Sequence, residues 1–245
     1  MPADVVQSLW IGPRLSAMER LSLASFLRHG HAVHLYTYGE VEGVPEGVVI
    51  RDGREILPAE RIFYYRDYPS VSGFSNFFRY KLLLERGGWW VDTDMVCLRP
   101  LRFEDAHVFA SELSRGGQFV TTGAIKAPAG SEAMSLAWEV CESKNPADLK
   151  WGETGPSLLA DVIAALSLDA FVQPPEVFCP LSYPEWQRVL DAEPPALPDA
   201  AVTLHLWNEM WRRNGRDKDA AQEPACLYER LKRENQCAVE TWPGP

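Results

Sequence analysis

The N-terminal part of the chain alternates between a strand, a helix and a second strand, and this order constrains the fold more than any other feature. Residues 5–11 (VVQSLWI) are mostly apolar and predict a strand. Ser16 precedes Glu19 by three positions, the spacing of a capping box, so a helix is predicted from there to about Arg28. Residues 32–38 (AVHLYTY) alternate in polarity and predict the second strand. Because two strands joined by a helix are normally parallel, we expect a parallel sheet.

The rest of the chain continues as a mixture of strands and helices and is predicted to form a single α/β domain over residues 1–245. A helix over 76–86, capped by Ser75, leads through Gly87-Gly88 into a short central strand at 89–91. Further strands are predicted at 47–50, 95–98, 118–125 and 201–207, and further helices at 131–143, 155–166 and 224–234. Residues 173–200 contain seven prolines and predict an irregular segment or lid, after which a C-terminal strand and helix (201–245) close the site.

Composition excludes several classes of function. A formal net charge of −10 argues against nucleic-acid binding, which needs a basic face to neutralise phosphates. No run of apolar residues is long enough to predict a transmembrane segment, and the N-terminus lacks the basic region of a signal peptide. The five cysteines contain no C-x-x-C pair, which fits reduced thiols. We therefore expect a cytoplasmic, bacterial protein, with peripheral attachment to the inner membrane as the alternative.

Asp92 and Asp94 follow the predicted strand at 89–91 and are separated by one residue. Residues i and i+2 of an extended chain point to the same side, so both carboxylates are predicted to face one spot. Two neighbouring carboxylates repel unless a cation lies between them, and Mg²⁺ or Mn²⁺ prefers such oxygen ligands. A lone D-x-D also occurs in solvated turns. Here the carboxyl end of a buried strand, with Asn76 and Arg79 on one face of the preceding helix, favours a metal–diphosphate site.

The stretch FSNFFRYKLLLERGGWWVDTDMVCLRP (74–100) resembles the signature S-D-x-x-R-Y-x-x-L-x-x-x-G-G-x-Y-x-D-x-D of glycosyltransferases with a sugar-binding D-x-D region. That group includes α-1,6-mannosyltransferase-like and α-1,4-galactosyltransferase-like enzymes and, more distantly, the clostridial glucosylating toxins. Three further blocks resemble the family in the expected order: its opening strand, helix and strand (8–38), its T-G-P helix start (TGPSLL, 154–159) and its closing His-x-Trp segment (LHLWNEMW, 204–211).

The resemblance implies a GT-A fold, the Rossmann-like fold of nucleotide-diphospho-sugar transferases, with a mostly parallel central sheet. It also implies a retaining, metal-dependent glycosyltransferase of polysaccharide biosynthesis that uses Mn²⁺ or Mg²⁺. The donor would be a nucleotide-sugar, most simply a UDP-sugar, and the acceptor a hydroxyl group of a glycan or a small molecule.

The resemblance assigns roles to individual residues. It implies that Asp94 binds the metal directly, that Asp92 bridges metal and ribose, and that Arg79 reaches toward the donor sugar or its phosphate. His205 is the candidate third metal ligand, with Asn208 and Glu209 as alternatives. Trp10 would stack on the nucleotide base. Further donor contacts are implied for Ser75, Asn76, Tyr80 and Trp207, with Arg212 or Arg213 assisting departure of the diphosphate and Glu153 and Thr154 facing the acceptor.

Some residues have other interpretations. Trp10 also fits an ordinary core side chain, and His205 a structural histidine on a strand. Asn76 stands where the family usually has Asp, and Trp90 where it has Tyr, so an inactive sugar-nucleotide-binding relative is one alternative. A Mg²⁺-dependent phosphatase of the haloacid-dehalogenase type is the other, because it also places D-x-D after a strand; its later paired acids have no counterpart in this chain.

Overall fold

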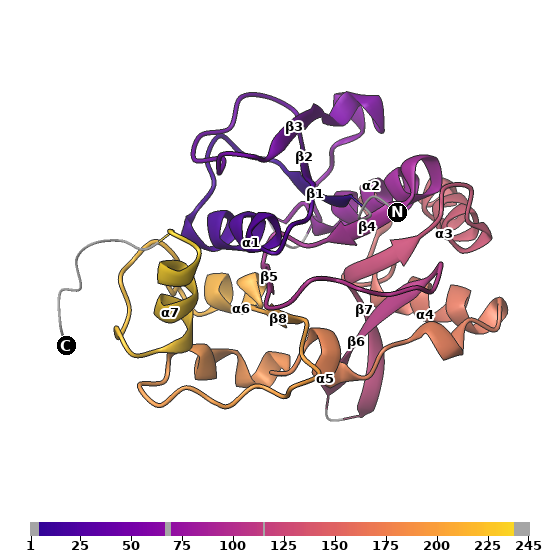
Figure 1. The fold of residues 1–245 in the computed structure, drawn as a ribbon. Helices are drawn as coiled ribbons and strands as arrows, with labels where there is room; N and C mark the ends of the chain where they lie inside the picture. The colour runs from indigo at the N-terminus through magenta and orange to yellow at the C-terminus, as the bar shows by residue number, and fades with distance from the viewer. Residues whose placement is uncertain (1–4, 67–69, 115, 238–245) are drawn as a thin grey trace.

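The computed structural model describes residues 5–66, 70–114 and 116–237, and its centre is a six-stranded sheet (Figure 1). The strand order is β3-β2-β1-β4-β7-β6, formed by β1 (Val6–Trp10), β2 (Val33–Thr37), β3 (Val49–Asp52), β4 (Gly88–Val91), β6 (Val108–Ser114) and β7 (Gly117–Ala127). β3, β2, β1 and β4 are parallel, and β7 is antiparallel to both of its neighbours. β6 therefore runs in the direction of the first four, and the prediction of a mostly parallel sheet is confirmed.

Helix α1 (Ala17–Arg28) joins β1 to β2, as the sequence predicts. The Glu19 carboxylate accepts a hydrogen bond from the Ser16 backbone N–H at 2.7 Å, and the Ser16 side chain accepts one from the first turn of the helix. The predicted capping box is therefore confirmed.

The two faces of the sheet are covered by different helices (Figure 1). Neighbouring residues of a strand point to opposite faces, and β4 shows this with two indoles that are each 1% exposed. Trp90 packs in the cluster formed with α2 (Ser72–Arg86), α3 (Glu132–Ser143) and α4 (Pro156–Ala165). Trp89 packs in the cluster formed with α1. Burial on both faces explains why β4 reads as an uninterrupted apolar run.

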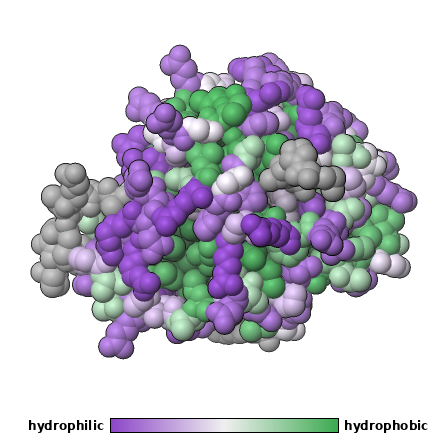
Figure 2. Space-filling view, in the orientation of Figure 1, coloured by the Kyte–Doolittle hydropathy of each residue, from purple (hydrophilic) through white to green (hydrophobic). Residues whose placement is uncertain are grey.

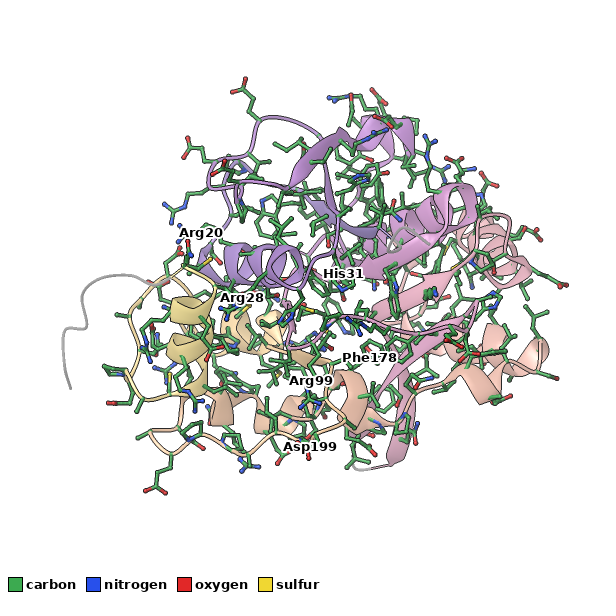
Figure 3. The ribbon with its side chains drawn as sticks, viewed as in Figure 1. Arg20, Arg28, His31, Arg99, Phe178 and Asp199 are labelled. Carbon is green, nitrogen blue, oxygen red and sulfur yellow. The ribbon has the colours of Figure 1, made fainter. Side chains whose placement is uncertain are left out.

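The C-terminal part of the chain packs against the outer side of α1. It contains α5 (Pro175–Phe178), α6 (Asn208–Arg213), α7 (Leu227–Glu234) and a 3-10 helix at Tyr183–Leu190. Met18 and Leu21 of α1 share a buried cluster with side chains from this part. A second, two-stranded antiparallel sheet pairs β5 (Met95–Cys97) with β8 (Thr203–His205). Close to it, the Arg99 guanidinium donates to the backbone carbonyl of Asp199 (Figure 3).

Several elements differ from the sequence prediction. Helix α2 begins at Ser72 with Val71 as its N-cap, so Ser75 lies inside the helix and does not cap it. β6 was not predicted, and residues 173–200 contain α5 and the 3-10 helix instead of wholly irregular chain. Residues 238–245 of the predicted C-terminal segment lie outside the described residues. The single-domain organisation and the lid stay predictions.

The surface seen in Figure 2 is largely hydrophilic, with a hydrophobic group over the region of β2 and β3. Val49 and Ile50 of the edge strand β3 are 47% and 52% exposed. Among the described residues, no helix is long and apolar enough to cross a membrane.

Candidate active site

A pocket of about 690 Å³ lies where β1 and β4 end, and β8 and α6 form its other side. Side chains that are far apart in the sequence meet in it. The lining includes seven of the predicted site residues, namely Trp10, Ser75, Arg79, Asp92, Asp94, His205 and Trp207. Open α/β sheets bind ligands at the carboxyl ends of their strands, and this pocket has that position.

Asp92 and Asp94 reach the pocket through a turn. The Asp92 N–H donates to the Gly123 carbonyl at 2.8 Å, and the Met95 N–H donates back to the Asp92 carbonyl at 3.0 Å. The chain therefore turns between β4 and β5, and the extended geometry expected from the i, i+2 spacing is wrong. Both carboxylates nevertheless line the same pocket, because the turn presents them on its pocket side.

Asp92 is held by Trp90 and Arg79. Its Oδ1 accepts a hydrogen bond from the Trp90 indole N–H at 2.9 Å and lies 3.1 Å from the Arg79 guanidinium, which also packs 4.8 Å from the Trp90 ring centroid. Burial raises the pKa of Asp92 and the Asp94 charge adds to this, while Arg79 opposes it; the net direction is upward. The indole at position 90 therefore supplies a donor to Asp92 where the family resemblance expects a tyrosine.

Asp94 is held by β8 and by the start of α6. Its Oδ2 lies 3.2 Å from His205 Nε2 and accepts a hydrogen bond from the Asn208 N–H at 2.8 Å. Burial alone would raise the pKa of Asp94, but His205 and the Asn208 N–H outweigh it and lower that pKa. Burial also disfavours the charged form of His205 and by itself would lower the pKa of the ring. The Asp94 carboxylate outweighs burial, and the pKa of His205 lies well above 6.5. The pair therefore favours an ionised Asp94.

His205 and Trp207 form a rigid unit at the pocket wall. Their rings stack with centroids 3.7 Å apart, and the Trp207 indole N–H donates to the Leu181 carbonyl at 2.9 Å. Trp207 has φ 56° and ψ 55°, the left-handed region that a bulky residue rarely adopts. Such strain persists only where surrounding contacts fix it, and it clusters at ligand sites.

The two aspartates fit a divalent ion shared with a ligand. Their protein contacts use Asp92 Oδ1 and Asp94 Oδ2, which leaves Asp92 Oδ2 and Asp94 Oδ1 for a cation. A Cβ at Gly123 would lie 3.8 Å from Asp92 Oδ2, so the glycine keeps this space open. Mg²⁺ is commonly held by one or two carboxylates plus substrate phosphates, and this donor set matches.

A complete protein cage for a metal is not formed. Within the part of the chain that the structure describes, no group of three or more His, Cys, Asp or Glu side chains is arranged to hold an ion. The physical reason is that His205 Nε2 faces Asp94 Oδ2. His205 as a metal ligand therefore stays a prediction, and in this structure the ring orients Asp94.

Other predicted residues lie next to the pocket or beneath it. Arg79 is 3% exposed and bonds Ser75 and the Thr122 carbonyl as well as Asp92, so it acts here on protein groups. Asn76 and Tyr80 are buried in α2 and do not line the pocket; the Tyr80 hydroxyl donates to the Gly155 carbonyl at 3.3 Å. The direct donor contacts of Asn76 and Tyr80 stay predictions, and in this structure both side chains lie beneath the pocket.

Among the predicted acceptor-side and phosphate-side residues, Glu153, Arg212 and Arg213 form ion pairs within the protein. Glu153 pairs with Lys144 at 2.8 Å and Thr154 is fully buried, and neither lines the pocket. Arg212 and Arg213 do line it, and both contact Glu209 at 2.7 Å. Their role toward a diphosphate stays a prediction.

Two features of the pocket escaped the sequence prediction. Glu112 of β6 lines it although it is only 6% exposed. The only signal in the sequence was an acid two positions after the short apolar run VFA (108–110), in a strand that was not predicted. The rim carries three exposed aromatic side chains, Tyr64, Trp151 and Tyr183, which come from separate segments of the chain and carry no local motif.

Two parts of the chain that contribute to this pocket are similar to known protein families. Residues 45–113 match the family described as a glycosyltransferase sugar-binding region containing the DXD motif, and residues 143–239 match the α-1,4-glycosyltransferase conserved region. The aspartates lie in the first match, and His205 with Trp207 in the second.

Curated relatives agree. A human α-1,4-N-acetylglucosaminyltransferase is 27% identical over 150 residues, which is 54% of this chain and 41% of the relative. A human lactosylceramide 4-α-galactosyltransferase is 27% identical over 187 residues, 63% of this chain and 51% of the relative. The matches thus span about half the length of these relatives.

A solved structure supports the fold. The WbbM bifunctional glycosyltransferase, in its apo structure, aligns with a TM-score of 0.51 and 12% identity over 96% of this chain and 50% of that chain. The chain therefore has the GT-A fold, and two parts of its sequence are similar to glycosyltransferase families, one of them defined by a sugar-binding region with the DXD motif.

Proposed function

We propose that the protein transfers a sugar from a UDP-sugar to a hydroxyl group of a glycan, with Mn²⁺ or Mg²⁺ and with retention of the anomeric configuration. The observation that carries the proposal is the pocket at the sheet edge. There an indole, two carboxylates with one free oxygen each, and a buried arginine behind them line one space. The family matches displace the phosphatase alternative.

The nucleotide is proposed to bind between Trp10 and the aspartates. Trp10 lines the pocket with part of its ring packed on the core, so it offers a fixed surface for stacking of a base. Asp92 and Asp94 lie in the turn that follows the neighbouring strand β4, and β4 pairs with β1. A base on Trp10 would therefore place its diphosphate over the two carboxylates.

The aspartates would hold the divalent cation through Asp92 Oδ2 and Asp94 Oδ1. When bound, such a cation neutralises the charge that develops on the diphosphate as the bond to the sugar breaks. The protein prepares this arrangement by fixing the other oxygen of each carboxylate. Arg79 and Trp90 orient Asp92, while His205 and the Asn208 N–H orient Asp94.

The rim supports a glycan acceptor. Tyr64, Trp151 and Tyr183 are 58%, 42% and 40% exposed, unusual for large aromatic side chains, and all three line this pocket. Exposed aromatic groups gathered at one mouth indicate a binding surface, and their apolar faces suit the C–H faces of sugar rings. The human lactosylceramide 4-α-galactosyltransferase, as its name states, transfers galactose to lactosylceramide, and this agrees with a sugar acceptor.

The experiment is a transfer assay with purified protein, a panel of UDP- and GDP-sugars and a mixture of glycan acceptors. We expect release of UDP with Mn²⁺ or Mg²⁺ that stops with a chelator and returns when metal is added back. NMR of the first product formed reports retention. Absence of metal-dependent release from every donor would refute the proposal. Cytoplasmic location and a role in polysaccharide biosynthesis stay predictions.

A further inference from the structure

Glu112 is a buried carboxylate whose Oε2 has no hydrogen-bond partner within the described part of the chain. It lies on β6 just after an irregularity in the β6–β7 pairing between Phe109 and Ser111. Such bulges re-aim side chains and occur beside active sites. An unpaired buried acid is unfavourable for folding, so its presence in the pocket lining needs an explanation other than stability.

The order of strands shows which part of a donor Glu112 would meet. β1, β4, β7 and β6 are consecutive neighbours in the sheet. Trp10 ends β1, Asp92 follows β4, and Glu112 belongs to β6, on the side of Asp92 away from Trp10. Between them β7 contributes Gly123, whose missing side chain leaves space beside Asp92 and His205. With the base on Trp10 and the diphosphate at the aspartates, the group next along this line is the sugar.

The chemistry of the ligand follows from charge. A diphosphate oxygen would be repelled by a second acid, whereas a sugar hydroxyl is a neutral hydrogen-bond donor. Burial raises the pKa of Glu112 to about 7, the nearby His205 opposes this, and Glu112 lines the same pocket as Asp94 and His205. Both the carboxylate and the carboxylic acid can accept a hydrogen bond from a hydroxyl.

We infer that Glu112 is a sugar-binding residue whose Oε2 accepts a hydrogen bond from a hydroxyl group of the pyranose bound at the reacting end of the pocket. The inference rests on the proposed function for the position of the nucleotide. The pyranose is the transferred sugar of the donor or the terminal sugar of the acceptor, and the two sources give different results in the experiment below.

The experiment compares Glu112→Leu, which is close in size but apolar, with Glu112→Gln and with the surface control Glu139→Gln. Calorimetry with Mn²⁺ measures binding of UDP and of the UDP-sugar that the wild type uses. Steady-state assays measure donor hydrolysis without acceptor and the KM for acceptor. Unfolding by urea shows that the variants fold.

If Glu112 binds the donor sugar, we expect Glu112→Leu to weaken UDP-sugar binding about 10- to 100-fold and to leave UDP binding unchanged. This factor corresponds to the loss of one hydrogen bond to a charged group. If Glu112 binds the acceptor sugar, the affinities for UDP and UDP-sugar and the rate of donor hydrolysis stay as in the wild type. The KM for the acceptor then rises by a similar factor. Glu112→Gln, which keeps an accepting oxygen, should lose less in either case.

A merely structural Glu112 gives another pattern. Loss of stability in Glu112→Leu with unchanged UDP-sugar affinity and acceptor KM overturns the inference. Unchanged values throughout overturn it as well. If wild-type protein itself binds no UDP with metal, the proposed function fails, and this is seen before any variant is compared.

Discussion

Replacing Glu112 by glutamine should stabilise the protein at pH 8 but not at pH 5. Burial raises the pKa of Glu112 from 4.5 to about 7, with His205 opposing the rise. At pH values between 4.5 and about 7, Glu112 keeps its proton in the folded protein but has released it in the unfolded chain. The contribution of Glu112 to the stability of the wild type is therefore most favourable below about pH 4.5 and falls as the pH rises toward 7. Glutamine carries no ionisable group and lacks this dependence.

The magnitude follows from the size of the pKa change. Each pKa unit corresponds to about 1.36 kcal/mol, so ionisation of Glu112 costs up to about 3 kcal/mol above pH 8. Any penalty from the amide itself is present at both pH values, because protonated Glu and Gln are similar in shape and charge. The quantity to compare is thus the gain in unfolding free energy of Glu112→Gln at pH 8 minus the gain at pH 5.

Urea unfolding of the wild type, Glu112→Gln and Glu139→Gln at both pH values makes the measurement. Titrating groups that do not interact with Glu112 contribute equally to the wild type and the variant and cancel in the difference. Glu139 is exposed on α3, so its replacement should give the same small effect at both pH values. A Glu112→Gln effect that does not change between pH 5 and pH 8 would refute the reasoning that burial disfavours the charged form.

Three further predictions concern the pocket. Gly123→Ala places a methyl group 3.8 Å from Asp92 Oδ2. Calorimetry should show metal-dependent UDP binding weakened several-fold, while the free energy of unfolding changes by less than about 1 kcal/mol. Unaltered binding would show that neither the metal nor the nucleotide occupies this space. Tyr183→Ala should raise the acceptor KM about 3- to 10-fold and leave donor hydrolysis unchanged, since the ring is at the rim; equal loss in both assays would contradict an acceptor role. Arg79→Met removes the guanidinium that pairs with the partly buried Asp92 carboxylate. It should lower the free energy of unfolding, measured in urea at pH 7, by about 2–3 kcal/mol. A loss under about 0.5 kcal/mol would mean that water solvates Asp92 well enough without Arg79.

The sequence predicts those elements that local rules determine. The capping box at Ser16 locates α1, a mostly apolar run locates β1, and alternation in polarity locates β2. β6 was missed because its residues VFASELS do not alternate strictly in polarity. The strand is defined by its hydrogen-bonded pairing with β7, which the local sequence does not show. The start of α2 was misplaced because Ser72 and Gly73 are poor predictors of a helix interior, and the close approach of Phe63 and Tyr65 to Gly73 is a tertiary feature that no local pattern shows.

The site was predictable where a short motif carries it. The D-x-D spacing and the closing His-x-Trp segment identify Asp92, Asp94, His205 and Trp207, and the structure brings all four into one pocket. What the motif could not give is the distribution of hydrogen bonds among them. His205 Nε2 faces Asp94, a contact that joins β8 to the turn after β4 across 111 positions of sequence. Glu112 was missed for the same reason, since only tertiary burial distinguishes it from a surface acid.

Titration calorimetry of the purified protein with UDP, with and without Mn²⁺, tests the central claim most directly. Asp94→Asn removes a charge while keeping the shape, and Asp161→Asn, on the exposed side of α4 and outside the pocket lining, is the matched control. We expect the wild type and Asp161→Asn to bind UDP tightly only with Mn²⁺, and Asp94→Asn to lose at least tenfold of that affinity while still folded. UDP binding that is absent from the wild type, or that is the same with and without metal, would contradict the account.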